Sequence, residues 1–332
     1  GRVGTAAWRG HGAGSRKGIG HRLHVRAARH AVESALPGRK ESMNNAATLT
    51  DHYPTRVDHS EIHDRHDPVV WPGRSGPWPD GAVDDFAARG FRSVEGVLGA
   101  GDIRDVRAEI DAVTTRLGTD ERVIRETSDG SVRSVFAVHE LSEKIASIIA
   151  REEIAGVARQ LLGDDVYVHQ SRVNLKPGFA GGPFYWHSDF ETWHAEDGMP
   201  TPRAVSVSLA LTPNTPFNGS LMIMPGSHRR FVSCVGRTPG EYHRESLKSY
   251  RPPFGTPEER DIAAMADEYG IEQVTGGAGS ALYFDCNCLH ASAGNISPYP
   301  RSNLFVVFNA VSNGLQEPFA ADARRPEYLA TR

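Results

Sequence analysis

Cysteine is scarce in this chain, which has three among its 332 residues. Cys286 and Cys288 are too close in sequence for an easy disulfide, and the odd total leaves one cysteine without a partner. The sequence therefore excludes a disulfide framework. It fits a reducing compartment, which we expect to be the cytoplasm.

Long hydrophobic runs are also missing. No stretch approaches the roughly 20 consecutive apolar residues of a membrane-spanning helix, so we expect no membrane partner. Hydrophobic residues make up 39% of the chain and charged residues 23%, a balance typical of globular proteins. The length allows one large domain or two ordinary ones, and no internal repeat divides it.

Charge is unevenly distributed. Residues 1–42 hold nine Lys or Arg and two Asp or Glu, which leaves 28 basic and 39 acidic residues for the rest. An acidic main body argues against a nucleic-acid partner. The basic segment lacks the apolar core of a secretory signal, although an Arg-rich transit segment or a basic tail would also fit it. We expect Met43 to be the natural start, residues 1–42 to be a disordered extension, and residues 43–332 to form a single domain.

Apolar residues at three- and four-residue steps predict amphipathic helices over 103–117, 143–162 and 256–269. Glycines that suit helix ends follow the second and third segments. The two glycines are Gly163 and Gly270. The start of the third helix is predicted by a capping box of Thr256 and Glu259, with Pro257 at the first helical position.

From residue 166 onward the period changes to two, which is typical of strands. Segment 168–176 carries an unusual polar face, formed by Gln170, Arg172, Asn174 and Lys176. Segment 204–211 alternates Val or Leu with Ala or Ser. Such faces are often simply solvated, but here they flank a candidate metal site, which favours a polar interior with room for ligands.

Further strands are predicted at 221–224, 280–286 and 301–310. Helices followed by many strands predict a mainly β fold with flanking helices. Its core would be a double-stranded β-helix, the jelly-roll or cupin-like arrangement.

The triplet His187-Ser188-Asp189 is the strongest chemical signal. In a strand, residues two apart point to the same face, so one more histidine from another strand, His290, completes two imidazoles and a carboxylate. That set binds one side of a metal in non-heme Fe(II) oxygenases and leaves other positions open. Arg301, which opens the next strand, suits the carboxylate of a bound keto acid.

Other residues compete for the third metal position. His228 lies in a Pro-Gly-Ser turn, and its structural role there is an adequate explanation. His194 falls on the opposite face from Asp189 if the strand continues. Cys286 and Cys288 are soft ligands, which we interpret as core or cavity lining. We therefore prefer His290.

Trp193 shares strand parity with His187 and Asp189, so a continuing strand would point its ring into the metal cavity. A tryptophan is more often a packing residue than a recognition residue. An indole that faces such a cavity can nevertheless hold a cationic ring by cation–π attraction.

Long stretches of the chain resemble the ectoine hydroxylases, a family within the phytanoyl-CoA dioxygenase superfamily. The stretches are VYVHQSRVNLKPGF at 166–179, FYWHSDFETWHAEDGMP at 184–200, FDCNCLH at 284–290 and PRSNLFVVFNAVSN at 300–313. The similarity extends from about Tyr53 to Glu327. The resemblance implies one dioxygenase domain that uses Fe(II), 2-oxoglutarate and O2 to convert ectoine to 5-hydroxyectoine, with release of succinate and CO2. The product is an osmolyte that protects against stress, and the family suggests a homodimer.

The resemblance also implies roles for single residues. His187, Asp189 and His290 match the iron ligands, and Arg301 matches the residue that holds the distal carboxylate of 2-oxoglutarate. No catalytic residue beyond the iron centre is implied. The other cosubstrate positions are Lys176, Asn174, Phe184, Ser206 and Ser292. The substrate positions are Gln170 and Trp193 and, as weaker matches, Arg172, Thr192, Phe284, Phe305 and Asn303.

Three alternatives stay open. The same chemistry could act on another small, amino-acid-like substrate or on an acyl-CoA. Two histidines and a carboxylate also form catalytic zinc sites. A jelly roll can also be a non-catalytic ligand-binding protein, because fold alone does not determine function. Related halogenases replace the carboxylate ligand by a small residue, so Asp189 favours hydroxylation.

Overall fold

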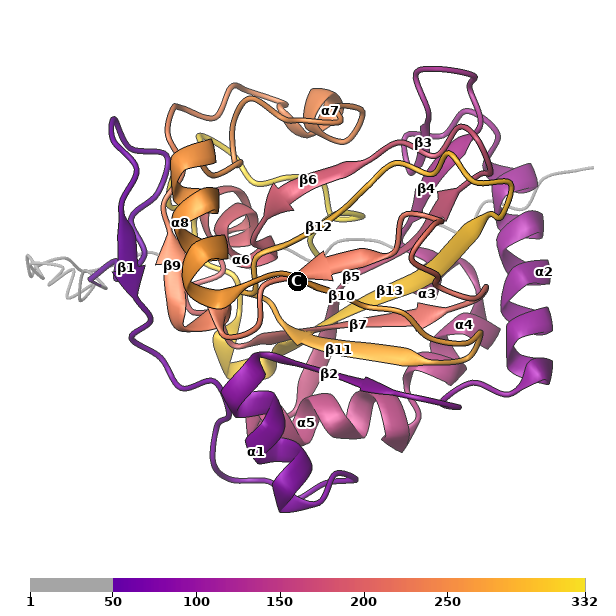
Figure 1. The fold of residues 1–332 in the computed structure, drawn as a ribbon, viewed down its shortest axis with the longest axis horizontal. Helices are drawn as coiled ribbons and strands as arrows, with labels where there is room; N and C mark the ends of the chain where they lie inside the picture. The colour runs from indigo at the N-terminus through magenta and orange to yellow at the C-terminus, as the bar shows by residue number, and fades with distance from the viewer. Residues whose placement is uncertain (1–49, 332) are drawn as a thin grey trace, which may run out of the picture. The chain divides into compact units, whose positions relative to one another are not determined.

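The computed structural model describes residues 50–331, so the expected extension over 1–42 and the expected start at Met43 lie outside the described residues. The largest element is a seven-stranded antiparallel sheet, β2-β11-β7-β13-β5-β4-β3 (Figure 1). Its strands are β2 (Phe91–Val94), β11 (Ala281–Asp285), β7 (Ala204–Ala210), β13 (Arg301–Ala310), β5 (Val166–Lys176), β4 (Val132–Phe136) and β3 (Val123–Arg125).

A smaller antiparallel sheet has the order β10-β8-β12-β6. It consists of β10 (Glu272–Gln273), β8 (Leu221–Ile223), β12 (His290–Ser292) and β6 (Phe184–His187). Leu221 and Ile223 of this sheet share one buried cluster with Phe284 and Phe305 of the large sheet, so the two sheets face each other. This arrangement confirms the predicted double-stranded β-helix core. A separate ribbon pairs β1 (Ile62–Asp64) with β9 (Arg230–Val232).

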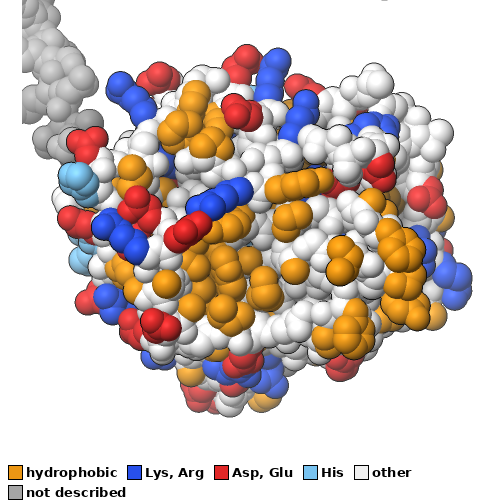
Figure 2. All heavy atoms as spheres, turned by 45° about the horizontal axis from the view of Figure 1, so that its top comes forward, with side chains coloured by type: hydrophobic (Ala, Val, Ile, Leu, Met, Phe, Trp, Pro, Cys, Tyr) orange, Lys and Arg blue, Asp and Glu red, His pale blue; other side chains and the backbone are white. Residues whose placement is uncertain are grey.

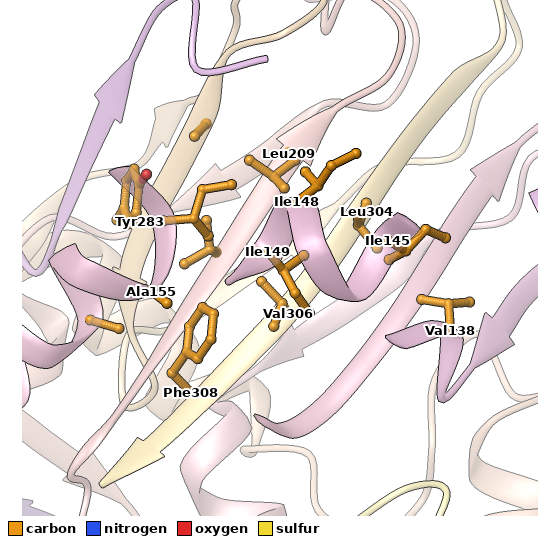
Figure 3. Close-up of a cluster of buried hydrophobic side chains, with 14 of the residues drawn as sticks. Val138, Ile145, Ile148, Ile149, Ala155, Leu209, Tyr283, Leu304, Val306 and Phe308 are labelled. Atoms are coloured by element: carbon orange, nitrogen blue, oxygen red, sulfur yellow. The ribbon is translucent and has the colours of Figure 1, made fainter. Parts of the chain in front are cut away.

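Helices cover the outer face of the large sheet (Figure 3). Ile145, Ile149 and other helical residues pack there against Leu304 and Val306 of β13. The apolar positions of β5, β7 and β13 are thus used by the helices, and their alternate positions face the smaller sheet. The helices on this face are α1 (Asp80–Arg89), α2 (Ala100–Leu117), α3 (Val138–Leu141), α4 (Glu143–Ile149) and α5 (Val157–Leu162).

The remaining helical segments lie nearer the smaller sheet and the loops. They are α6 (Asp189–Thr192), a π-helical turn Trp193–Asp197, α7 (His243–Ser246), α8 (Glu259–Tyr269) and the 3₁₀ turns Ser227–Arg229 and Val311–Asn313. The face turned forward in Figure 2 shows apolar side chains gathered between scattered charged ones. Among the described residues, no helix is long and apolar enough to cross a membrane.

Two predicted helices need correction. The segment 143–162 is not continuous, because Arg151 is extended and a π-helical turn, Glu152–Gly156, separates α4 from α5. The Arg151 guanidinium binds Asp102 of α2 at 2.7 Å and 2.9 Å, so a contact with another helix holds the break. The segment 143–162 still ends, as predicted, at Gly163, whose backbone has the left-handed conformation.

The third helix begins at Glu259 without a side-chain cap, so the predicted capping box is wrong. The Thr256 hydroxyl instead donates to the carbonyl of Pro252, 2.9 Å away, and belongs to the preceding loop. Gly270 follows the last turn with φ 72°, as the sequence predicted.

Candidate metal centre

Three side chains converge between the two sheets. One nitrogen each from His187 and His290 and one Asp189 oxygen all lie within 4.8 Å of one another. Nε2 of His187 is 3.6 Å and Nε2 of His290 is 4.0 Å from Oδ1 of Asp189. Two imidazole nitrogens and a carboxylate oxygen at this separation fit one divalent metal ion such as Fe(II).

The local fold that assembles this group differs from the prediction. His187 and His290 lie directly opposite each other in the β6–β12 pair. Strand β6 ends at His187, and Ser188 caps a helix that begins at Asp189. The expectation that Asp189 follows His187 along one strand is therefore wrong. A strand-to-helix turn brings the carboxylate to the same point.

Hydrogen bonds orient all three side chains. Nδ1 of His187 contacts the Tyr185 carbonyl at 2.7 Å, and Nδ1 of His290 contacts the Cys288 carbonyl at 3.1 Å. Each Nδ1 therefore carries a proton, which leaves Nε2 with a lone pair for a metal. The Ser206 hydroxyl donates to Oδ2 of Asp189 at 3.1 Å and leaves Oδ1 directed at the imidazoles.

The protonation states also suit a metal. Burial, assisted by His187, lowers the pKa of His290 to about 4, so its imidazole is neutral at neutral pH. Burial opposes ionisation of Asp189, but His290, His187 and Arg172 outweigh this effect and hold its pKa below the usual range. A neutral imidazole and an ionised carboxylate are the coordinating forms.

A second group lies beyond the metal position, where Lys176 and Arg301 are opposite each other in the β5–β13 pair. The Lys176 ammonium donates to Ser292 Oγ at 2.9 Å and to the Ala293 carbonyl. Arg301 donates to the Gly219 carbonyl at 2.7 Å. Burial lowers the pKa of Lys176 to about 6 and that of Arg301 to about 10. Neither has a carboxylate partner within the described part of the chain, so a dicarboxylate ligand fits here.

A cavity of about 150 Å³ opens beside His187 and Asp189. Its floor is the polar face of β5, which pairs with β13 in the large sheet. Phe305 pairs with Arg172 and Asn303 with Asn174. The residues proposed from the sequence that line the cavity are Gln170, Arg172, Asn174, Phe184, Thr192 and Trp193.

Trp193 lies in the π-helical turn rather than in the strand that would have directed it inward. It nevertheless lines the cavity, and its ring packs edge-on against His169 with centroids 5.1 Å apart. On the floor, Gln170 donates to the Leu329 carbonyl at 2.6 Å and accepts from Arg172. The Arg172 guanidinium lies 5.1 Å from the Phe305 ring centre.

Other residues proposed from the sequence lie outside the lining of this cavity. Phe284 packs edge-on against His290 with centroids 5.0 Å apart, and Ser206 contacts Asp189. These two support metal-binding side chains. Asn303 donates to Ser208 at 2.8 Å, whereas its buried Oδ1 has no partner.

The competing ligands lie elsewhere. Nε2 of the buried His228 contacts the Ala87 carbonyl at 3.1 Å, outside the donor group. His194 contacts the Met199 carbonyl and Asp51. Cys286 and Cys288 are buried thiols in apolar clusters, and burial raises their pKa well above the ordinary value.

Sequence reasoning missed most of the opposite wall of the cavity. Arg56 binds Glu191 at 2.7 Å and Glu196 at 3.0 Å, and Arg325 binds Asp197 at 2.6 Å. Arg56 and Arg325 lie near the two ends of the region that resembles the ectoine hydroxylases. That resemblance was the signal by which they could have been found. The missed lining residues are Arg56, Arg133, Ser134, Phe136, Tyr185, Glu196, Arg325 and members of the loop between Tyr242 and Thr256.

Comparisons with known proteins agree with this geometry. A family model described as phytanoyl-CoA dioxygenase matches residues 86–303. The ectoine dioxygenase of Nocardia farcinica is 54% identical over 285 residues, which are 85% of this chain and 94% of the relative. That of Halomonas elongata is 47% identical over 288 residues, 84% of this chain and 86% of the relative.

Solved structures of EctD from S. alaskensis are similar as well. The structure with 2-oxoglutarate and 5-hydroxyectoine has a TM-score of 0.76 at 40% identity and covers 85% of this chain and 95% of that one. The structure with bound Fe has a TM-score of 0.75 at 41% identity, with the same coverage.

Proposed function

The chain belongs to the phytanoyl-CoA dioxygenase family and, within it, to the ectoine dioxygenases. On this premise we propose that it hydroxylates ectoine to 5-hydroxyectoine, with Fe(II) as its metal and 2-oxoglutarate and O2 as cosubstrates. Succinate and CO2 are the other products. The observation that carries the proposal is the donor group of His187, Asp189 and His290 next to two buried basic side chains, Lys176 and Arg301, without a carboxylate partner in the described chain.

The residues divide the work between three ligands. His187, Asp189 and His290 would hold the iron, which when bound supplies the redox chemistry that activates oxygen. Arg301 would bind the distal carboxylate of 2-oxoglutarate. Lys176, which donates to Ser292, lies opposite Arg301 in the β5–β13 pair. Asn174, Phe184 and Ser206 complete this side of the site. The orientation of the keto acid is thus set by charge and by the register of β5 and β13.

The substrate is a cyclic zwitterion, and the cavity presents charges of both signs. The Arg172 guanidinium, held by Gln170, suits the substrate carboxylate. The buried face of Trp193 suits its cationic ring by cation–π attraction. Thr192 lines the cavity beside this position, and Phe305 packs against the Arg172 guanidinium. Phe284 and Asn303 lie behind the lining, where they contact His290 and Ser208. We expect the segment from Tyr242 to Thr256, which contributes to the cavity lining, to limit the access of water to the reacting C–H bond.

The deciding experiment measures oxygen uptake and succinate formation by the iron-loaded protein with 2-oxoglutarate, with and without ectoine. Succinate formed in equal amount with 5-hydroxyectoine, and only in the presence of ectoine, supports the proposal. Equal succinate formation without ectoine contradicts the substrate assignment. Turnover with zinc in place of iron would contradict the redox chemistry. Absence of any turnover would contradict the enzymatic function and favour a non-catalytic ligand-binding protein.

The assembly and the compartment belong to the same proposal. The family resemblance supports a homodimer, and the three free, buried cysteines fit a reducing compartment such as the cytoplasm. Light scattering coupled to size-exclusion chromatography tests the dimer; a mass equal to one chain contradicts it.

A further inference from the structure

Arg133 on β4 has no part in the assignments above, yet it is a fully buried arginine that lines the cavity. Its side chain is 2% exposed in the ion pair with Glu126. Burial lowers its pKa despite that carboxylate. A cation buried at such a cost needs an explanation in its contacts.

These contacts converge on the start of β6. Nη1 of Arg133 binds both carboxylate oxygens of Glu126, at 3.1 Å and 3.3 Å. Nη2 donates to the Pro183 carbonyl at 2.8 Å, and the guanidinium carbon lies 3.9 Å from the Phe184 ring centre. A planar guanidinium can make these contacts together, which an ammonium cannot. Three residues after Phe184, the same strand presents His187.

Phe184 also connects Arg133 to the two cations proposed to bind the cosubstrate. The Lys176 ammonium lies 5.3 Å from the Phe184 ring centre, and Lys176 pairs with Arg301 across the sheet. After burial, Arg301 and Arg133 both contribute to the lowered pKa of Lys176, so the three basic side chains share one electrostatic environment. With Glu126 as the one paired carboxylate, the surroundings carry an excess of positive charge that suits a dianion.

The cluster also reaches the loop above the cavity. The Tyr250 hydroxyl donates to Oε2 of Glu126 at 2.8 Å, and the Gly182 amide donates to Oε1 at 3.0 Å. A Cβ on Gly182 would lie 2.2 Å from the Tyr250 ring and 2.7 Å from Arg133, so no side chain fits there. The chain before β6 is therefore held tightly between Glu126, Arg133 and Tyr250.

We propose that Arg133 is a positioning residue for 2-oxoglutarate: it holds Pro183 and Phe184 in place, and so shapes the side of the pocket that faces Lys176 and Arg301. This inference rests on the proposed function. Nε of Arg133 is buried and has no hydrogen-bond partner among the described residues, so the contacts of the guanidinium run through Nη1 and Nη2.

The test compares Arg133→Met with the matched control Arg65→Met. Arg65 is also a buried arginine, which binds one carboxylate (Asp285, 2.8 Å) and backbone carbonyls, but it does not line the cavity. 2-Oxoglutarate is titrated into each iron-loaded protein without oxygen, and binding is followed by the absorption change of the iron complex. Michaelis constants for 2-oxoglutarate and ectoine and the thermal midpoints are measured in parallel.

We expect Arg133→Met to weaken 2-oxoglutarate binding at least about tenfold, because small displacements of a binding group have large effects. The Michaelis constant for ectoine should change less than about twofold, because Arg133 contacts Glu126, Pro183 and Phe184 and none of the residues assigned to the substrate. Arg65→Met should lower the thermal midpoint with 2-oxoglutarate affinity unchanged. Wild-type affinity in Arg133→Met, or equal losses in the two variants, overturns the inference.

If Arg133→Met does not fold, Arg133→Lys decides, since it keeps the charge but loses the planar fork. Its 2-oxoglutarate affinity should also fall, and wild-type affinity would contradict the positioning role. A wild-type protein that binds no 2-oxoglutarate would overturn the proposed function, and this inference with it.

Discussion

The floor and the wall of the cavity are built in different ways. The floor is the polar face of β5, which pairs with β13, and β13 in turn pairs with β7. The opposite face of these strands is packed under the helices. The wall is a short helix and a π-helical turn, 189–197, which carries Asp189 and Trp193. The floor depends on sheet register, whereas the wall depends on buried ion pairs from distant parts of the chain.

The wall shows why distant residues matter to a local motif. Glu191, Glu196 and Asp197 are buried acids within one short segment. Arg56 and Arg325 neutralise them from opposite ends of the described chain. Buried acids without these partners would be strongly destabilising, so the wall cannot be stable on its own. The floor has no such requirement, because its backbone hydrogen bonds hold it in place.

The largest effect is expected where wall and floor meet, at Asp189. Asp189→Ala should abolish hydroxylation and lower the iron content, because one of three metal donors is lost. Turnover and bound iron are measured together. In the matched variant Ser206→Ala, the metal-binding carboxylate is kept but loses its hydrogen bond from Ser206, and activity should fall by about 10–100-fold. Substantial turnover in Asp189→Ala would refute its role as a ligand.

Removing a wall partner should affect stability next most strongly. Arg56→Met removes the ion pairs of the buried Glu191 and Glu196 with Arg56. Because a buried charge that loses its partner is strongly destabilising, we expect a loss of about 3–5 kcal/mol in the free energy of unfolding. Denaturant titration measures this loss. A surface control, Arg244→Met, removes an exposed pair with Glu241 and should cost less than about 1 kcal/mol. Similar small losses in both variants would remove the contrast between wall and floor.

Trp193 separates recognition from support. In Trp193→Ala we expect the dissociation constant for ectoine to rise by roughly tenfold to thirtyfold, since a desolvated cation–π contact is worth about 2 kcal/mol and each 1.4 kcal/mol is about tenfold. Iron affinity should change much less. Isothermal titration with ectoine and metal analysis provide the two values. Equal losses of both would instead make Trp193 a structural residue of the wall.

On the floor, Lys176 predicts a pH dependence. Its pKa falls from an ordinary 10.5 to about 6 in the folded protein, first because of burial. Between these values the unfolded chain binds one more proton than the folded one, so stability should rise with pH, by up to about 1.4 kcal/mol per unit. Below pH 6 the full penalty is present. The rise should be absent from Lys176→Met in denaturant titrations without 2-oxoglutarate; identical pH profiles would contradict the buried, uncharged lysine.

Much of the floor was predictable. The alternation in 168–176 identified that strand and its polar face, because a strand buried on one face must repeat every two residues, and 301–310 was also predicted as a strand. The same argument failed after His187, where Ser188 starts a helix that no periodicity in so short a segment announces. The break at Arg151 was missed because an ion pair with Asp102 of another helix overrides local propensity. The capping box was wrong because Thr256 donates to the Pro252 carbonyl of its own loop instead.

The sequence by itself determined the chemistry of this protein: two imidazoles, a carboxylate, a keto-acid arginine and a strand face with polar side chains. These are properties of residue type and of local period, and both can be seen in a single chain. Only the tertiary structure decided how Asp189 joins the histidines, and that Arg56, Arg325 and Arg133 hold the walls around them. The ion pairs of Arg56 and Arg325 connect residues 135 and 128 positions apart, and Arg133 reaches Pro183, 50 positions away. The energies of these contacts depend on burial that no local pattern encodes.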